Sequence, residues 1–125
     1  MSFVRLFERI SATQLAETLR SPSAPRPLII DVRDSDFAGG HIRSAVNLPE
    51  DNFIDDDDVD TLVEKYKDEE LIVFHCMLSQ VRGPSCAKRF LSRMAVVLAD
   101  EEKKPEVRVL TGGYQNFSIV SASFE

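Results

Sequence analysis

The sequence predicts an α/β fold in which a central, mostly parallel sheet carries helices on both faces. Short apolar runs alternate along the chain with segments of helical periodicity, and this alternation is typical of parallel sheets. The runs are apolar enough for strands that are covered on both faces. The 125 residues, of which 43% are hydrophobic and 29% charged, have the size and composition of one soluble domain. We therefore expect a single domain over residues 1–125.

The first predicted helix begins at a clear N-terminal signal. Ser11 and Gln14 have the spacing of a capping box, in which each side chain bonds the backbone amide of the other residue. Ile10 and Leu15 are placed to make the hydrophobic contact that accompanies such a box. We expect this helix to end near Leu19, because a loop with two prolines follows.

Short apolar segments predict the strands, and the breaks between them predict the connections. The four candidate strands are residues 28–32, 45–48, 71–74 and 107–110. Residues 35–37 are expected to form a helical turn that ends at Gly39-Gly40. Gly112-Gly113 should make a tight exit from the last strand.

Apolar residues at helical intervals predict three further helices. One should follow the acidic residues 55–58, which suit the positive end of a helix dipole. A second should follow residue 82, and residues 114–119 predict a closing helix. The apolar positions of the first two helices are Val59, Leu62, Val63 and Tyr66, and then Ala87, Phe90, Leu91, Met94 and Leu98.

Composition and charge limit which binding partners and which cellular compartment we expect. A net charge of −6 argues against general binding to nucleic acids or acidic membrane surfaces. The apolar runs are too short to span a bilayer, and the first residues lack the apolar stretch of a signal peptide. We expect a cytoplasmic or nuclear protein that is a monomer or a weak dimer. The two cysteines then suggest reactive or buried thiols more than a structural disulfide.

No metal site is expected. Two histidines and two cysteines give no zinc ligand set of the usual spacing. Residues 55–58 lack the glycine and the spaced carboxylates of a calcium loop, so we interpret them as a solvated helix start.

The segment from Cys76 to Arg82 has the layout of a loop that wraps a tetrahedral oxyanion. A strand leads into the cysteine, and Arg82 is followed by Gly83-Pro84 and a helical pattern. Loop amides and the positive end of the helix would hold the anion, while the arginine binds two of its oxygens. The same field favours a Cys76 thiolate, which makes Cys76 and Arg82 the candidate catalytic residues. The candidate oxyanion-binding amides belong to Met77, Leu78, Ser79, Gln80, Val81 and Arg82.

Three motifs in order resemble the rhodanese-like domain. They are residues 28–33 with 37–49, the loop from Cys76 to Arg82, and residues 110–114. The resemblance spans nearly the whole chain and implies a three-layer fold around a five-stranded sheet. Five residues between cysteine and arginine resemble the M-phase inducer phosphatases and the eukaryotic arsenate reductases, especially small stand-alone members from plants and fungi. Sulfurtransferases of the superfamily generally have a loop one residue shorter.

This resemblance implies a phosphatase of the tyrosine or dual-specificity type that acts through a phosphocysteine. Its substrate would be a phosphoprotein or another phosphate-type oxyanion, and no cofactor is required. The alternative is arsenate reduction, with glutathione and glutaredoxin as reductants. Thiosulfate sulfur transfer and a non-catalytic anion-binding module are weaker alternatives. The general acid stays unassigned, because human-type phosphatases carry an acidic residue where this chain has Val81. Asp34, Asp36 and Glu50 are the remaining candidates.

Five further residues are singled out near the motifs. His75 should point to the opposite sheet face from Cys76 and orient the loop. Asp31, Arg33 and His41 belong to the first rhodanese-like motif, and we expect them to tie the loops together around the sheet edge. Cys86, expected in the first turn of the helix after the loop, is either a packed thiol or a resolving thiol for Cys76.

Overall fold

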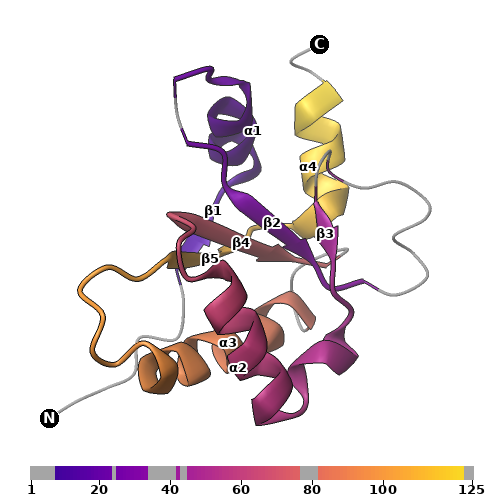
Figure 1. The fold of residues 1–125 in the computed structure, drawn as a ribbon. Coiled ribbons are helices and arrows are strands. Elements are labelled where there is room, and N and C mark those ends of the chain that lie inside the picture. The colour runs from indigo at the N-terminus through magenta and orange to yellow at the C-terminus, as the bar shows by residue number, and fades with distance from the viewer. Residues whose placement is uncertain (1–7, 24, 34–41, 43–44, 77–81, 123–125) are drawn as a thin grey trace, which may run out of the picture.

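The computed structural model describes residues 8–23, 25–33, 42, 45–76 and 82–122, which form three layers (Figure 1). The middle layer is a sheet of β1 (Glu8–Ile10), β2 (Leu28–Asp31), β3 (Val46–Asn47), β4 (Leu71–His75) and β5 (Glu106–Leu110). The strand order is β1-β5-β4-β2-β3, and each neighbouring pair is parallel. The predicted α/β class and the five-stranded sheet are confirmed.

Helices cover both faces of this sheet (Figure 1). On one face, α1 (Ala12–Arg20) lies against α4 (Gly113–Ala122). On the other, α2 (Asp56–Tyr66) packs against α3 (Arg82–Val97). The short 3₁₀ helix η2 (Glu50–Phe53) connects β3 to α2 and also contacts α3.

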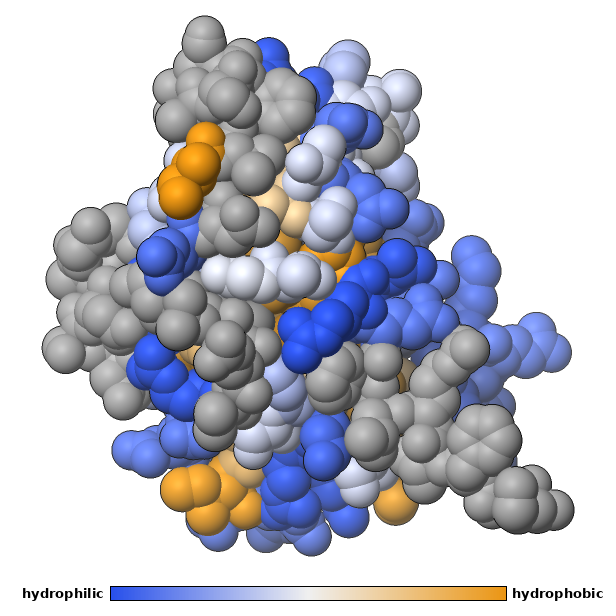
Figure 2. All heavy atoms as spheres, turned by 180° about the vertical axis from the view of Figure 1, so that it is seen from behind, coloured by the Kyte–Doolittle hydropathy of each residue, from blue (hydrophilic) through white to orange (hydrophobic). Residues whose placement is uncertain are grey.

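The described residues expose few large hydrophobic side chains. Among the described residues, the large hydrophobic side chains that are exposed are Ile54, Val96 and Ile119. On the face seen in Figure 2, hydrophobic residues appear as small separate patches among hydrophilic ones. The coloured residues on that face therefore form no large contiguous hydrophobic patch.

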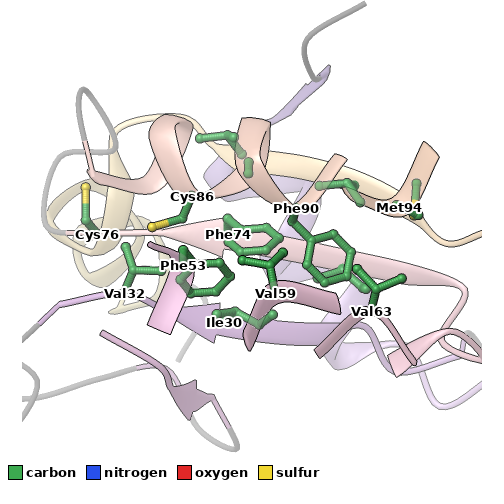
Figure 3. Close-up of a cluster of buried hydrophobic side chains, with 14 of the residues drawn as sticks. Ile30, Val32, Phe53, Val59, Val63, Phe74, Cys76, Cys86, Phe90 and Met94 are labelled. Atoms are coloured by element: carbon green, nitrogen blue, oxygen red, sulfur yellow. The ribbon is translucent and has the colours of Figure 1, made fainter. Parts of the chain in front are cut away.

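Side chains of β4 alternate between two hydrophobic clusters, one on each face of the sheet. Ile72, Phe74 and Cys76 belong to the cluster under α2 and α3 (Figure 3). Val73 belongs to the cluster under α1 and α4. Because successive side chains of a strand point to opposite faces, this alternation places His75 opposite Cys76, as predicted.

The predicted start of α1 is confirmed in detail. The Ser11 hydroxyl accepts from the Gln14 amide at 3.0 Å, and the Gln14 side chain accepts from the Ser11 amide at 3.0 Å. Ile10 and Leu15 are both buried in the same cluster. The box thus fixes the angle at which β1 passes into α1.

Several elements differ from the prediction. The strand β1 and the helix η2 were not predicted, since β1 buries only Ile10 and η2 buries only Phe53. The closing helix is longer than residues 114–119. The expectation that Cys86 lies in the first turn of its helix is wrong: α3 already begins at Arg82, so Cys86 lies in the second turn. The turn expected at 35–37 lies outside the described residues.

Candidate active site

Cys76 directly follows β4, at the carboxyl edge of the parallel sheet. Its side chain is buried, with 4% of its surface exposed. The Gly83 amide donates to the Cys76 sulfur at 3.4 Å. Because α3 begins at Arg82, the sulfur lies at the positive end of that helix, where a thiolate is stabilised.

Gly83 allows the start of α3 to approach the end of β4 closely. A Cβ atom at this position would lie 3.3 Å from the His75 Cα and 3.4 Å from the Cys76 nitrogen. Both neighbours are backbone atoms, which have little freedom to move. A residue without a side chain therefore lets the helix amide approach the sulfur without crowding these atoms.

The backbone carbonyl of Cys76 is held by residues on the face of the sheet opposite its sulfur. It accepts a hydrogen bond from the Tyr114 amide at 3.0 Å. The His75 Nδ1 lies 3.2 Å from the same carbonyl, and because a carbonyl only accepts, Nδ1 carries the hydrogen. Gly112 and Gly113, with φ values of 77° and 61°, make the tight turn that brings Tyr114 there. The predicted glycine exit from the last strand is confirmed.

Asp31 and Arg33 form a buried ion pair on the same face of the sheet as His75. The Arg33 Nη2 lies 2.7 Å from the Asp31 Oδ2, and the Arg33 Nε also donates to that carboxylate. The guanidinium carbon lies 4.5 Å from the centre of the Tyr114 ring. The Asn47 side-chain Nδ2 donates to the backbone carbonyls of Asp31 and Arg33. This network connects β2, β3 and the start of α4.

His75 is a neutral imidazole in this environment. Burial lowers its pKa, and the opposing effect of the nearby Asp31 carboxylate is smaller. Its Nε2 is 3.7 Å from the Asp31 Oδ2 and has no hydrogen-bond partner within the described part of the chain. The position suits a residue that orients the Cys76 backbone better than one that transfers protons at the sulfur.

Cys86 is a packed thiol in the cluster under α2 and α3, with 1% of its surface exposed. Burial raises its pKa to about 12, and the charges of Glu50 and Cys76 act in the same direction. Figure 3 shows its side chain pointing toward the end of the cluster where Cys76 lies. Neither cysteine is in a disulfide. A resolving role for Cys86 stays a prediction.

The structure brings some predicted site residues together and separates others. Cys76, Gly83 and Cys86 lie on the α2/α3 face of the sheet, with Arg82 at the start of α3. Asp31, Arg33 and His75 gather on the other face. Met77, Leu78, Ser79, Gln80, Val81, His41, Asp34 and Asp36 lie outside the described residues, so their predicted roles stay predictions.

The sequence reasoning gave no role to two residues that hold this region together. Tyr114 was quoted only as part of the last motif, although the preceding glycine turn was a signal for it. Asn47 was quoted only within the first motif, residues 37–49, and its hydrogen-bond partners come from a neighbouring strand.

Two negative findings apply to the described residues. None of their helices has the length and apolar character needed to cross a membrane. In the same ranges, no three or more His, Cys, Asp or Glu side chains are grouped so that they could hold a metal ion.

Comparison with known proteins agrees with this architecture. Residues 11–119 match the rhodanese-like domain family. The dual specificity phosphatase Cdc25 of Arabidopsis thaliana is 36% identical, over 99% of this chain and 75% of its own length. Arsenate reductase 2.2 of Oryza sativa subsp. japonica is 34% identical, over 88% of this chain and 81% of its own.

A solved structure supports the same conclusion. The As-Sb reductase of Leishmania major aligns with a TM-score of 0.81 and 31% identity, over 94% of this chain and 80% of its own. The family match covers most of the chain. The resemblance noted from the sequence is therefore confirmed, and this chain belongs to the rhodanese-like domain family.

Proposed function

We propose that this protein is a cysteine-dependent phosphatase that hydrolyses aryl phosphate monoesters, including phosphotyrosine in proteins. The single observation that carries the proposal is the contact between the Gly83 amide and the Cys76 sulfur at the start of α3. It puts a buried thiol at a helix N-terminus, where bound anions are also stabilised. Similar proteins are named as a dual specificity phosphatase, an arsenate reductase and an As-Sb reductase. These names imply oxyanion substrates.

The proposed reaction has two steps. The Cys76 thiolate attacks phosphorus, so that a sulfur–phosphorus bond forms while the bond to the leaving oxygen breaks. Arg82 and the amides of residues 77–82 hold the three equatorial oxygens. Water then attacks the phosphocysteine, which releases inorganic phosphate and restores the thiolate.

Protonation of the leaving oxygen limits the choice of substrate. Of the three candidate acids, only Glu50 is among the described residues, and it lies on η2. Because Val81 stands where human-type phosphatases carry an acidic residue, we expect aryl phosphates, whose leaving groups are good, to react much faster than alkyl phosphates. Similar rates on nitrophenyl phosphate and on an alkyl phosphate would count against this mechanism.

The deciding experiment compares three donors in parallel: nitrophenyl phosphate, arsenate with glutathione and glutaredoxin, and thiosulfate with a thiol acceptor. We expect hydrolysis of the aryl phosphate by the wild type and none by Cys76→Ser. Ser92→Ala, an exposed change further along α3, serves as the handling control. Arsenite formation without phosphate release would replace the phosphatase proposal with the reductase alternative.

A further inference from the structure

A cavity lies between η2 and the beginning of α3, and we call it the η2–α3 cavity. Glu50, Asp51, Phe53 and Ile54 line one side, and Ser85 and Cys86 line the other. Its volume of about 260 Å³ is below the range of pockets that hold whole drug-sized ligands. A space of this size suits one side chain of a larger partner.

The cavity is next to the predicted oxyanion site. Ser85 and Cys86 belong to the helix that begins with Arg82, and Gly83 of the same helix contacts the Cys76 sulfur. The charges of Glu50, Cys76 and Arg82 all act on the Cys86 thiol. A substrate bound at Cys76 therefore brings its neighbouring residues close to this cavity.

Among the described residues that line the cavity, two carry carboxylates, Glu50 and Asp51. Arg89 also lines it, but its guanidinium donates to the Phe53 carbonyl at 3.2 Å and the Ile54 carbonyl at 2.8 Å, and it pairs with Asp56. Glu50 and Asp51 have no ion-pair partner in the described part of the chain. On the other side of Arg89, the aspartates 55–58 line a more open hollow, which extends the negative potential around the entrance.

The walls combine these carboxylates with apolar surface. Phe53 is buried at the base of η2, and Ile54 is 63% exposed beside it. Lysine and arginine side chains suit such a site, because their aliphatic stems cover apolar surface while their charged ends meet carboxylates. A carboxylate or a second phosphate would be repelled.

We infer that the η2–α3 cavity is a specificity subsite for a lysine or arginine that lies next to the phosphorylated residue of a protein substrate. The inference rests on the proposed phosphatase function and adds a preference to it. The phosphate binds at Cys76, the basic side chain enters the cavity, and Glu50 and Asp51 bind its cation. Arg89 has a positioning role, because it ties η2 to α3.

The test uses phosphotyrosine peptides that differ at one residue. A single lysine is placed at each position flanking the phosphotyrosine, and each peptide is paired with a copy that carries acetyl-lysine there. Acetylation keeps the aliphatic stem of the side chain and removes its charge. The readout is the ratio of kcat/KM between the two members of a pair, for the wild type and for Glu50→Gln/Asp51→Asn. The matched control is Glu101→Gln/Glu102→Gln, which removes the same charge beyond the far end of α3.

We expect the wild type to favour the lysine peptide by about three- to tenfold at one flanking position, as for partly exposed ion pairs. The preference should disappear in Glu50→Gln/Asp51→Asn, persist in Glu101→Gln/Glu102→Gln and weaken in high salt. An active enzyme with no preference at any position overturns the subsite but not the phosphatase. If Glu50→Gln/Asp51→Asn loses kcat/KM equally on both peptides of every pair, the subsite is also overturned. Glu50 is then assigned to the chemical step. A protein inert to nitrophenyl phosphate and to all peptides overturns both proposals.

Discussion

Replacing Gly83 by alanine tests whether the close approach of α3 to β4 positions the reacting sulfur. The added Cβ would lie 3.3 Å from the His75 Cα and 3.4 Å from the Cys76 nitrogen. The first distance is tighter than most contacts of a Cβ atom and the second is at the edge of the ordinary range, so we expect the helix start to shift by a few tenths of an ångström. The shift moves the Gly83 amide, now 3.4 Å from the sulfur, away from the thiolate that it stabilises.

We expect Gly83→Ala to lower activity more than it lowers stability. A hydrogen bond to a charged group contributes about 1.5–3 kcal/mol, so its loss should lower kcat/KM by about 10- to 100-fold. Crowding costs about 1–3 kcal/mol, while alanine gains about 1 kcal/mol over glycine in a helix. We therefore expect the free energy of unfolding to fall by no more than about 2 kcal/mol.

Two assays on the same preparation separate these effects. Steady-state hydrolysis of nitrophenyl phosphate gives kcat/KM, and urea unfolding gives the free energy of unfolding. Ser92→Ala raises helix propensity at an exposed position of α3 and should leave both quantities near their wild-type values. A folded Gly83→Ala variant with wild-type kcat/KM would show that the amide contact does not position the nucleophile.

Three other perturbations test the surroundings of the site. Since burial raises the pKa of Cys86 to about 12, iodoacetamide at mildly alkaline pH should label Cys76 and spare Cys86; equal labelling in peptide mass spectra would contradict the packed-thiol interpretation. The pKa of His75 is lowered from 6.5 in the fold, so as the pH falls the unfolded state gains this proton at a higher pH than the folded state does. The free energy of unfolding should then fall by up to about 1.4 kcal/mol per pH unit from this group, and a pH series on His75→Gln should lack that component. Arg33→Ala leaves the buried Asp31 carboxylate without its cation, which should cost about 3–5 kcal/mol in urea unfolding; a loss below about 1 kcal/mol would show that the ion pair is dispensable.

Local patterns predicted most of the fold and the centre of the site. The capping box of α1, the apolar strands and the position of Cys76 after β4 each follow from residues that are neighbours in sequence. The strand β1 was missed because only Ile10 is buried there, so its three residues carry no alternation long enough to detect. Its place is set instead by pairing with β5.

The rest of the site depends on contacts between distant segments. Asn47 donates to carbonyls 16 and 14 residues away in sequence. Arg89, which lines the η2–α3 cavity, bonds carbonyls 36 and 35 residues earlier in the chain. Sequence reasoning named Glu50 only as a candidate acid, since nothing local indicates that it lines a cavity beside Cys86.

The reacting thiol and the buried network that holds its backbone lie on opposite faces of the sheet. The thiol of Cys76 lies on the α2/α3 face, while the buried charges of Asp31 and Arg33 lie on the other face with His75. The Cys76 carbonyl connects the two, because it accepts from the Tyr114 amide on the supporting side. Through this bond the network fixes where the loop begins without placing a carboxylate beside the thiolate. Changes in the network should therefore act on activity through the position of Cys76, whereas changes at Gly83 act on the sulfur directly.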